Sequence, residues 1–310
     1  MNLRDLEYVV AVADHGHFGR AAAACNVSQP TLSGQILKLE AELGLRLFER
    51  EGRRARVSDR AAAVIASARA TLVAAAAVSE SARAARDPFA GPLRLGVIAT
   101  VAPYLLPLAL TAAIDALPQT PLHLAEDLTD RLLAGIHSGA LDGAVIATDP
   151  EDDKLAGIAL YDEPFYLVSA RRPDGRKRAS IRIEEIDPGN LLLLAEGHCL
   201  RDQALALCGE AQMAARRADV RATSLETLRH LVSAGQGQTL APQLAYADWR
   251  RLGAGLEGSR IVGGGASRQV RLVFRRGSPR LAALEALAQS LRGSAEPALA
   301  ASRRDGREGG

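Results

Sequence analysis

The sequence predicts a mixed α/β protein in which a small helical unit precedes a larger domain of alternating strands and helices. In the first 58 residues, apolar side chains recur at helical spacing around a tight turn. Beyond residue 92, strand-forming runs alternate with helical patterns, as is typical of α/β domains with mainly parallel sheets. The length of 310 residues, with 48% hydrophobic and 24% charged residues, fits a globular chain of two or three domains.

The first unit is expected to contain three helices. The first is marked by apolar residues at helical spacing, namely Leu3, Leu6, Val9, Val10 and Ala13. A short second helix is expected over residues 19–25, and a tight turn follows at residues 26–28. Ser28 is placed to cap a third helix over residues 29–43. Pro30 falls in its first turn, where a missing N–H group does no harm.

A basic hairpin and a long helix connect this unit to the rest of the chain. Residues 47–57 are expected to form the hairpin, and six arginines but only three acids lie within residues 46–60. Nothing breaks a helix from Ser58 to about Arg86, which gives a rod of roughly 43 Å at 1.5 Å per residue. Its apolar residues follow a heptad repeat, so we expect it to pair with a second copy. The alternative is packing against its own domain.

The larger domain follows a linker at residues 87–92 and is expected to be built from alternating strands and helices. The strands are expected at residues 93–98, 121–125, 143–147, 165–169, 191–195, 219–222, 238–241 and 270–275. The helices are expected at residues 102–116, 128–138, 200–211, 224–234 and 280–292. Residues 293–310 are expected to be a disordered tail.

No export signal is visible, because acids lie where a signal peptide has its apolar region. No apolar run is expected to span a membrane, because Arg69 interrupts residues 61–78 and Pro107 interrupts residues 104–114. We therefore expect a cytoplasmic protein, in which a disulfide is more often catalytic or sensing than structural. The histidines show no metal-ligand spacing, so neither a metal nor a cofactor is expected.

Two cysteines nine positions apart, Cys199 and Cys208, are the most informative residues of the larger domain. The residues between them have a helical composition. Nine helical residues rise about 13.5 Å and turn about 900°, which places the two sulfurs on opposite faces. A disulfide needs Cα atoms roughly 4.4–6.8 Å apart, so the helix and the bond exclude each other. If these thiols pair, the segment must unwind. Cys25, on an alanine-rich helix, is interpreted as a small core residue.

The second and third helices of the first unit, with the turn between them, form a helix-turn-helix, whose second helix enters the DNA major groove. Short side chains at the start of that helix suit contacts to base edges and thymine methyl groups. Basic residues nearby suit phosphates. The residues that we expect to bind DNA are Ser28, Gln29, Pro30, Thr31, Ser33, Gln35, Lys38, Arg4, Arg50, Arg53 and Arg54.

The segment Phe18–Gly44, which reads FGRAAAACNVSQPTLSGQILKLEAELG, resembles the winged helix-turn-helix of LysR-type transcriptional regulators. The resemblance implies a DNA-binding domain at residues 1–58 and a dimerisation helix at 59–90. It also implies a two-subdomain effector domain like periplasmic binding proteins at 91–292. One departure is Ser58–Ala61, where the family commonly has a glycine at the fourth position. Tetramers on promoter DNA in the bacterial cytoplasm, at the nucleoid, are implied, with RNA polymerase as a partner.

Within this family, the segments GHCLRDQ (Gly197–Gln203) and RATSLETLR (Arg221–Arg229) resemble the hydrogen-peroxide-sensing OxyR branch. The resemblance implies that Cys199 reacts with peroxide and that Cys208 resolves the product into a disulfide, which a cellular thiol reductant reverses. An activator of oxidative-stress genes is implied. Supporting residues carried over from the branch are Thr100, Thr129, His198, Asp202 and Arg268.

The residue chemistry agrees with this resemblance. The thiolate is the reactive form of cysteine, and Cys199 opens a predicted helix whose N–H groups and dipole favour the anion. His198 is placed to donate a hydrogen bond from the adjoining position. We therefore expect a lowered pKa for Cys199. A sulfenic acid formed there would condense with a second thiol.

Two alternatives remain open from the sequence. The chain could be a LysR-type regulator that answers to a small carboxylate, with the cysteines incidental. It could also be a thiol peroxidase that merely consumes peroxide. The N-terminal unit argues against the enzyme, which has no use for a DNA-binding domain, so we expect no enzymatic activity.

Overall fold

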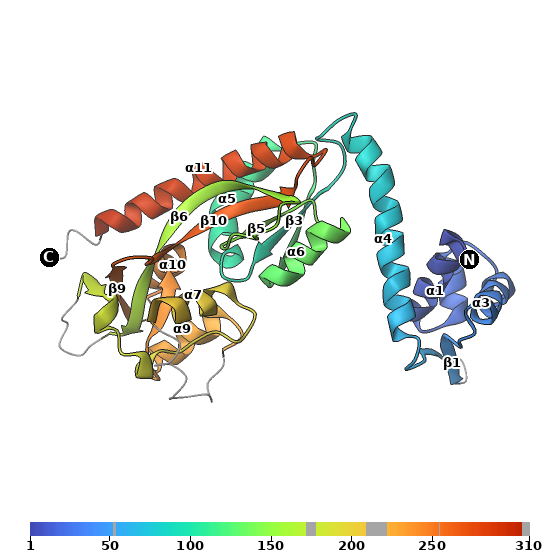
Figure 1. Ribbon diagram of the computed structural model, residues 1–310, viewed down its shortest axis with the longest axis horizontal. Coiled ribbons are helices and arrows are strands. Elements are labelled where there is room, and N and C mark those ends of the chain that lie inside the picture. Colours follow the sequence, from blue (N-terminus) through green and yellow to red (C-terminus); the bar gives the residue numbers. More distant parts are fainter. Residues whose placement is uncertain (52–53, 172–177, 209–221, 254, 306–310) are drawn as a thin grey trace. The chain divides into compact units, whose positions relative to one another are not determined.

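The computed structural model describes residues 1–51, 54–171, 178–208, 222–253 and 255–305 (Figure 1). The contacts between residues divide the chain into two compact units. The first is formed mainly by residues 1–82, and the second by most of the chain from residue 83 onward. Each unit has its own cluster of buried apolar side chains.

The first unit contains the helices and the hairpin that the sequence predicts. Its elements are α1 (Leu3–His15), α2 (Phe18–Ala24), α3 (Gln29–Leu43), β1 (Phe48–Glu51) and β2 (Arg54–Val57). The two strands pair antiparallel. Val9, Leu32 and Leu47 are completely buried between these elements, so the apolar face of each helix points into one small core.

Side-chain caps fix where α2 and α3 begin. The His17 imidazole accepts a hydrogen bond from the Gly19 backbone N–H at 2.9 Å, and the Ser28 hydroxyl accepts one from Thr31 at 3.3 Å. Asn26, with a φ of 55°, supplies the left-handed residue of the turn between the two helices. These local bonds set the start of α3, the helix that the sequence assigns to the major groove.

Replacing Ser28 by alanine should remove the N-cap of α3 and lower its local stability by about 1 kcal/mol. Amide exchange in α3 is then expected to become roughly fivefold faster, as measured by hydrogen–deuterium exchange. Ser224 caps α9 (Leu225–Ser233) through Thr227 in the same arrangement, so Ser224→Ala is the matched control. That variant should loosen α9 and leave α3 unchanged. Equal exchange in α3 for Ser28→Ala and the unaltered chain would contradict the capping argument.

The long helix α4 (Ala62–Ala84) begins four residues later than expected. Residues 58–61 instead form a turn in which the Ala61 N–H bonds the Ser58 carbonyl at 2.9 Å, while the Ser58 hydroxyl bonds the Arg46 carbonyl at 2.7 Å. This turn lies where the sequence departs from the family pattern. At this departure the chain forms a short turn that holds the start of α4 near the hairpin.

The two ends of the heptad seam on α4 differ in burial. Ala61 and Ile65 join the core of the first unit, as the alternative interpretation holds, whereas Leu72 is only half-buried and Ser79 is exposed. By length and mean hydropathy alone, α4 would be long and apolar enough to cross a membrane, contrary to our expectation. However, Arg69 of α4 forms an ion pair with Asp14 of α1, which ties α4 to the first helix of the first unit.

The second unit is a mixed sheet covered by helices (Figure 1). Its strands are β3 (Leu93–Ile98), β4 (Leu122–Asp127), β5 (Gly143–Ile146), β6 (Leu155–Ala170), β7 (Ser180–Arg182), β8 (Thr239–Pro242), β9 (Leu256–Val262) and β10 (Ser267–Arg275). Its α-helices are α5 (Ala102–Ala116), α6 (Thr129–Ser138), α7 (Cys199–Cys208), α9, α10 (Gln243–Arg251) and α11 (Leu281–Asp305). Two short 3₁₀ helices cover Ile183–Glu185 and Pro188–Asn190.

The strands β6 and β10 cross the whole second unit and join two halves. The strand order is β4-β3-β5-β10-β6-β9-β7, and β8 also pairs with β6. The first half comprises β3, β4 and β5 with α5 and α6; the second comprises β7, β8 and β9 with α7, α9 and α10. Among the strands of the described residues, parallel pairing occurs between β3 and its neighbours and between β7 and β9. The expectation of mainly parallel sheets is therefore wrong, because both crossing strands run antiparallel to every strand with which they pair.

Two further expectations differ from the structure. Residues 191–195 do not form the expected strand. They make two isolated bridges instead, Leu191 to Gln238 and Leu194 to Ala222. The expected strand at 219–222 lies outside the described residues except for Ala222. The expected tail from residue 293 is helical up to Asp305, because Ala295 and Leu299 are buried and the Gln243 amide donates to the Leu299 carbonyl at 2.6 Å. Figure 1 shows this helix, α11, running along β6.

Candidate functional site

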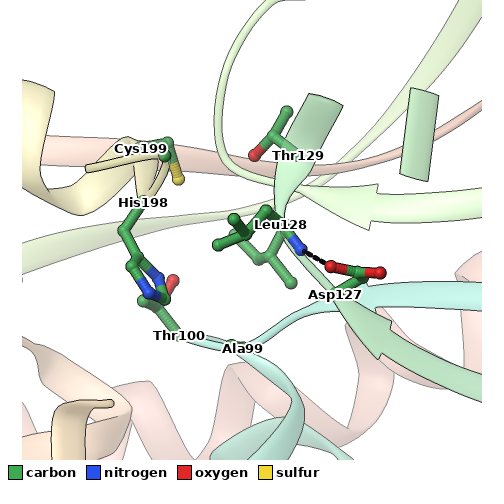
Figure 2. Close-up of a pocket in the computed structure, with 9 residues that line it drawn as sticks. Ala99, Thr100, Asp127, Leu128, Thr129, His198 and Cys199 are labelled. Carbon is green, nitrogen blue, oxygen red and sulfur yellow. Dashed lines mark hydrogen bonds between the residues drawn. The ribbon is translucent and has the colours of Figure 1, made fainter. Parts of the chain in front are cut away.

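Cys199 lies in a small pocket between the two halves of the second unit (Figure 2). It is the first residue of α7 and only 7% exposed. The pocket is lined by the end of β3, by the junction of β4 and α6, and by the loop before α7. The lining residues are Ile98, Ala99, Thr100, Asp127, Leu128, Thr129, Gly197, His198 and Cys199. Four residues predicted from the sequence, Thr100, Thr129, His198 and Cys199, therefore share one pocket.

Gly197 permits the close approach of the Cys199 loop to the first half. Its φ is 90°, and a Cβ at this position would lie only 2.9 Å from the Leu128 side chain. A larger residue would strain the backbone and push the loop away from α6. The glycine therefore allows the loop that carries Cys199 to pack closely against Leu128.

The two threonines approach the thiol from the first half. The Thr100 hydroxyl accepts a hydrogen bond from Arg268 Nη1 at 2.9 Å, and its carbonyl accepts one from Nη2 at 3.1 Å. The Thr129 hydroxyl is directed toward Cys199, as Figure 2 shows, and lowers the pKa of the thiol. Its oxygen is buried and has no other partner among the described residues. It is therefore free to bond a small molecule beside the sulfur.

Burial dominates the electrostatics of Cys199 and raises its pKa above the ordinary thiol value. The Arg268 charge, the Thr129 hydroxyl and the Leu200 N–H at the start of α7 act in the opposite direction but do not outweigh burial. The expectation of a lowered pKa is thus wrong for this state, because the surrounding core removes more hydration than the helix terminus replaces. The resting residue is a protonated thiol.

Asp202 does not support the thiolate. It is exposed on the first turn of α7, outside the pocket lining, and its charge raises the pKa of Cys199. His198 lines the pocket, but its hydrogen bond goes to the backbone of Thr223. Burial lowers the pKa of His198, so the ring is neutral near pH 7. The expected bond from His198 to the thiol is therefore replaced by one that anchors the loop.

Alkylation of Cys199 should keep accelerating above the ordinary thiol midpoint of about pH 8.5. The raised pKa means that the neutral thiol persists to higher pH, and only the thiolate reacts with iodoacetamide. The measurement is a pH–rate profile on a Cys25→Ser, Cys208→Ser chain, in which only Cys199 remains. Adding Asp202→Asn should move the midpoint down, because it removes a charge that opposes the thiolate. A midpoint below the ordinary value in the starting chain would contradict this account.

Arg268 bonds the pocket residue Thr100 from the crossing strand β10, and it forms a buried ion pair that was not predicted from the sequence. Its partner is Glu163 on β6, and the two side chains are each 1% exposed. The signal available in the sequence was the acid Glu163, which directly precedes the apolar run that starts at Pro164. Such an acid is buried only when paired, so it pointed to an unidentified cation.

Cys208 lies at the other end of α7 and is also buried and unpaired. Burial raises its pKa. A ten-residue helix separates the two sulfurs, which places their Cα atoms about 13.5 Å apart at 1.5 Å per residue. That separation is about twice what a disulfide allows. The helix predicted from composition is therefore present over Cys199–Cys208, and residues 209–211 of the expected span lie outside the described residues.

The described residues predicted to bind DNA belong to α3 and its N-cap, to the hairpin and, for Arg4, to α1. Ser28, Gln29, Pro30, Thr31 and Lys38 are exposed, as is Arg54, while Ser33 and Gln35 are half-buried. Arg4 is exposed but already bonded, to Glu7 at 2.7 Å and to the Cys25 carbonyl at 2.9 Å. The side chains of Arg50 and Arg53 lie outside the described residues.

Comparison with known proteins identifies the family. Residues 3–62 match the family described as bacterial regulatory helix-turn-helix protein, lysR family, and residues 86–296 match the LysR substrate binding domain. The DNA-binding transcriptional dual regulator OxyR of Escherichia coli (strain K12) is 41% identical over 292 residues, which cover 94% of this chain and 95% of that protein.

Solved structures give the same result. A variant of full-length OxyR from Pseudomonas aeruginosa is 36% identical, with a TM-score of 0.67 over 94% of this chain and 98% of that one. A hydrogen-peroxide-bound OxyR variant from Corynebacterium glutamicum is 34% identical, with a TM-score of 0.64 over 98% and 96% of the two chains. The chain therefore belongs to the LysR family of transcriptional regulators, within its hydrogen-peroxide-responsive OxyR branch.

Proposed function

We propose that this chain senses hydrogen peroxide by reversible formation of a Cys199–Cys208 disulfide and thereby controls the transcription of oxidative-stress genes as an activator. The observation that carries the proposal is the position of two buried thiols at opposite ends of one helix. One thiol opens into a pocket, and the other is too distant to bond without a change of structure.

The chemistry requires two steps. In the first, the Cys199 sulfur attacks one peroxide oxygen, the O–O bond breaks, and the products are a sulfenic acid and water. In the second, the Cys208 sulfur attacks the Cys199 sulfur, and the hydroxyl leaves as water to give the disulfide. Together the two thiols lose two electrons and peroxide gains them. A cellular dithiol that exchanges with the bridge returns the chain to its resting state.

The dimensions of the pocket favour a small oxidant. Its cavity volume of about 10 Å³ is comparable with the space that one water molecule needs. Pockets for larger metabolites are roughly 300–1,000 Å³. A carboxylate co-inducer at this site would have to displace the buried side chains that line it. The Thr129 hydroxyl and the Arg268-bound Thr100 offer hydrogen bonds to an oxygen beside the sulfur.

Promoter DNA is the macromolecular partner that the helix-turn-helix supports. We assign residues 1–58 to DNA binding, 59–90 to pairing of two chains through α4, and 91–292 to sensing. The exposed Val73 and Val78 on the second half of α4 are available to a second copy. Assembly of two such dimers into a tetramer, contact with RNA polymerase and location at the nucleoid complete the proposal.

The test is a titration of the whole chain with hydrogen peroxide, followed by non-reducing mass mapping and promoter footprinting on the same samples. The expected result is one Cys199–Cys208 bridge per chain and a footprint that changes with it. An unlinked pair of cysteines, or one footprint in both redox states, would refute the switch. Sustained peroxide turnover with a thiol reductant, far beyond one equivalent per chain, would instead indicate a peroxidase.

A further inference from the structure

The buried ion pair of Glu163 and Arg268 lies at the centre of the second unit. The two residues face each other directly across β6 and β10. Glu163 Oε2 accepts from Arg268 Nε at 2.9 Å and lies 2.8 Å from Nη2. Both side chains are almost completely shielded from water, so neither charge is screened by solvent.

Each member of the pair also bonds a different half of the second unit. Arg268 donates to the hydroxyl and the carbonyl of Thr100, in the loop between β3 and α5. Glu163 Oε1 accepts from the Leu244 backbone N–H at 2.8 Å, in the first turn of α10. The carboxylate thus caps a helix of the second half while it holds a cation that reaches the first half.

Glu163 restricts where the Arg268 guanidinium can lie. Arg268 Nε and Nη2 lie against Glu163 Oε2, while Nη1 and Nη2 donate to Thr100. A planar guanidinium that is held on one edge by a carboxylate presents its other edge in a fixed direction. That direction is toward the pocket, where the Arg268 charge lowers the pKa of Cys199.

We infer that Glu163 is a positioning residue for the reaction of Cys199: it holds Arg268 where the guanidinium orders Thr100 and supports the thiolate. This inference rests on the proposed function, since it assigns Glu163 to the peroxide chemistry of the same pocket. The carboxylate itself does not touch the reacting atoms. It acts through Arg268, and its effect on Cys199 should vanish when Arg268 is absent.

A double-mutant cycle on the full chain tests the inference. Cys25→Ser and Cys208→Ser leave Cys199 as the single thiol. Glu163→Gln, Arg268→Met and their combination are then compared with this starting chain. Two rates are measured for each: alkylation by iodoacetamide as a function of pH, and oxidation by hydrogen peroxide with the sulfenic acid trapped by dimedone.

Glu163→Gln should raise the midpoint of alkylation by roughly one pH unit and slow peroxide oxidation about tenfold, because a displaced Arg268 no longer favours the thiolate. In the combined variant, midpoint and rate should equal those of Arg268→Met alone to within about twofold, because Glu163 then has no cation to place. The neighbouring pair Asp162 and Gln269 is exposed on the same two strands, so Asp162→Asn is the matched control and should change neither rate.

An unchanged profile in Glu163→Gln would overturn the inference. So would a midpoint that falls, which would mean that the carboxylate merely screens the Arg268 charge. If Glu163→Gln does not fold, the comparison of Arg268→Met with the combined variant tests the inference, because the combined variant contains neither charge of the ion pair. A difference of more than about threefold between them contradicts the assigned route. Failure of the starting chain to react with peroxide, with the alkylation cycle intact, would count against the proposed function and not against the role of Glu163.

Discussion

Replacing Cys199 by serine is expected to abolish the response to peroxide, with the rate of oxidation of the second unit falling by at least about 100-fold. A serine hydroxyl is far less acidic than a thiol and does not attack peroxide. Cys208 cannot take over, because it lies at the opposite end of α7 and is not in the pocket. The measurement is the rate of sulfenic acid or disulfide formation after a pulse of hydrogen peroxide.

Cys25→Ser supplies the matched control for this loss. Cys25 lies at the end of α2 in the first unit, and its removal should leave the oxidation rate unchanged. Cys208→Ser should give a different defect: the chain reacts once but stops at the sulfenic acid, which dimedone traps. Oxidation of the Cys199→Ser chain at the original rate would remove Cys199 from the mechanism.

Oxidation is expected to unwind α7, which is the second large effect. A bridge between its first and last residues requires the Cα atoms to approach by roughly half of their separation, so the turns between them must open. Leu200 and Ala204 then leave the core, and the bond from the Gln203 amide to the Ala147 carbonyl, 2.8 Å in the resting state, is lost. That bond joins α7 to the first half, so the unwinding reaches both halves.

Hydrogen–deuterium exchange on the reduced and the oxidised chain measures this change. Amides of residues 200–208 should lose at least about tenfold of their protection in the disulfide form, because helical hydrogen bonds no longer shield them. Amides of α5, which follows the Thr100 loop, should keep their protection and serve as the internal reference. A bridged chain in which α7 remains protected would disprove the coupling between bond and shape.

Much of the site could be predicted from the sequence because its signals are local. The cap at Ser28, the composition between Cys199 and Cys208, and the apolar periods each act within about ten residues. They predicted α3 and the start of α7 at nearly the observed bounds. Thr100 and Thr129 came only from the family resemblance, yet both line the pocket.

The failures have a different origin, since each depends on contacts far apart in the chain. The acidity of Cys199 was misjudged because its burial comes from both halves, which no local pattern records. Glu163 was missed because its partner Arg268 is 105 positions away. The antiparallel course of β10 was missed because a strand pattern specifies its two faces but not its direction in the sheet.

The last turns of α11 have a practical consequence for work on the isolated sensing half of the protein. The sequence pattern suggests a domain boundary at residue 292. A protein truncated there would lose the part of α11 that packs against the start of α10. The buried Gln243 amide would lose its hydrogen bond to the Leu299 carbonyl, and the buried side chains of Ala295 and Leu299 would be missing. The apolar surface that they cover would be exposed, so the truncated protein should aggregate and be poorly soluble. For crystallography or spectroscopy of this domain, the expressed protein should therefore extend to Asp305, the last residue of α11.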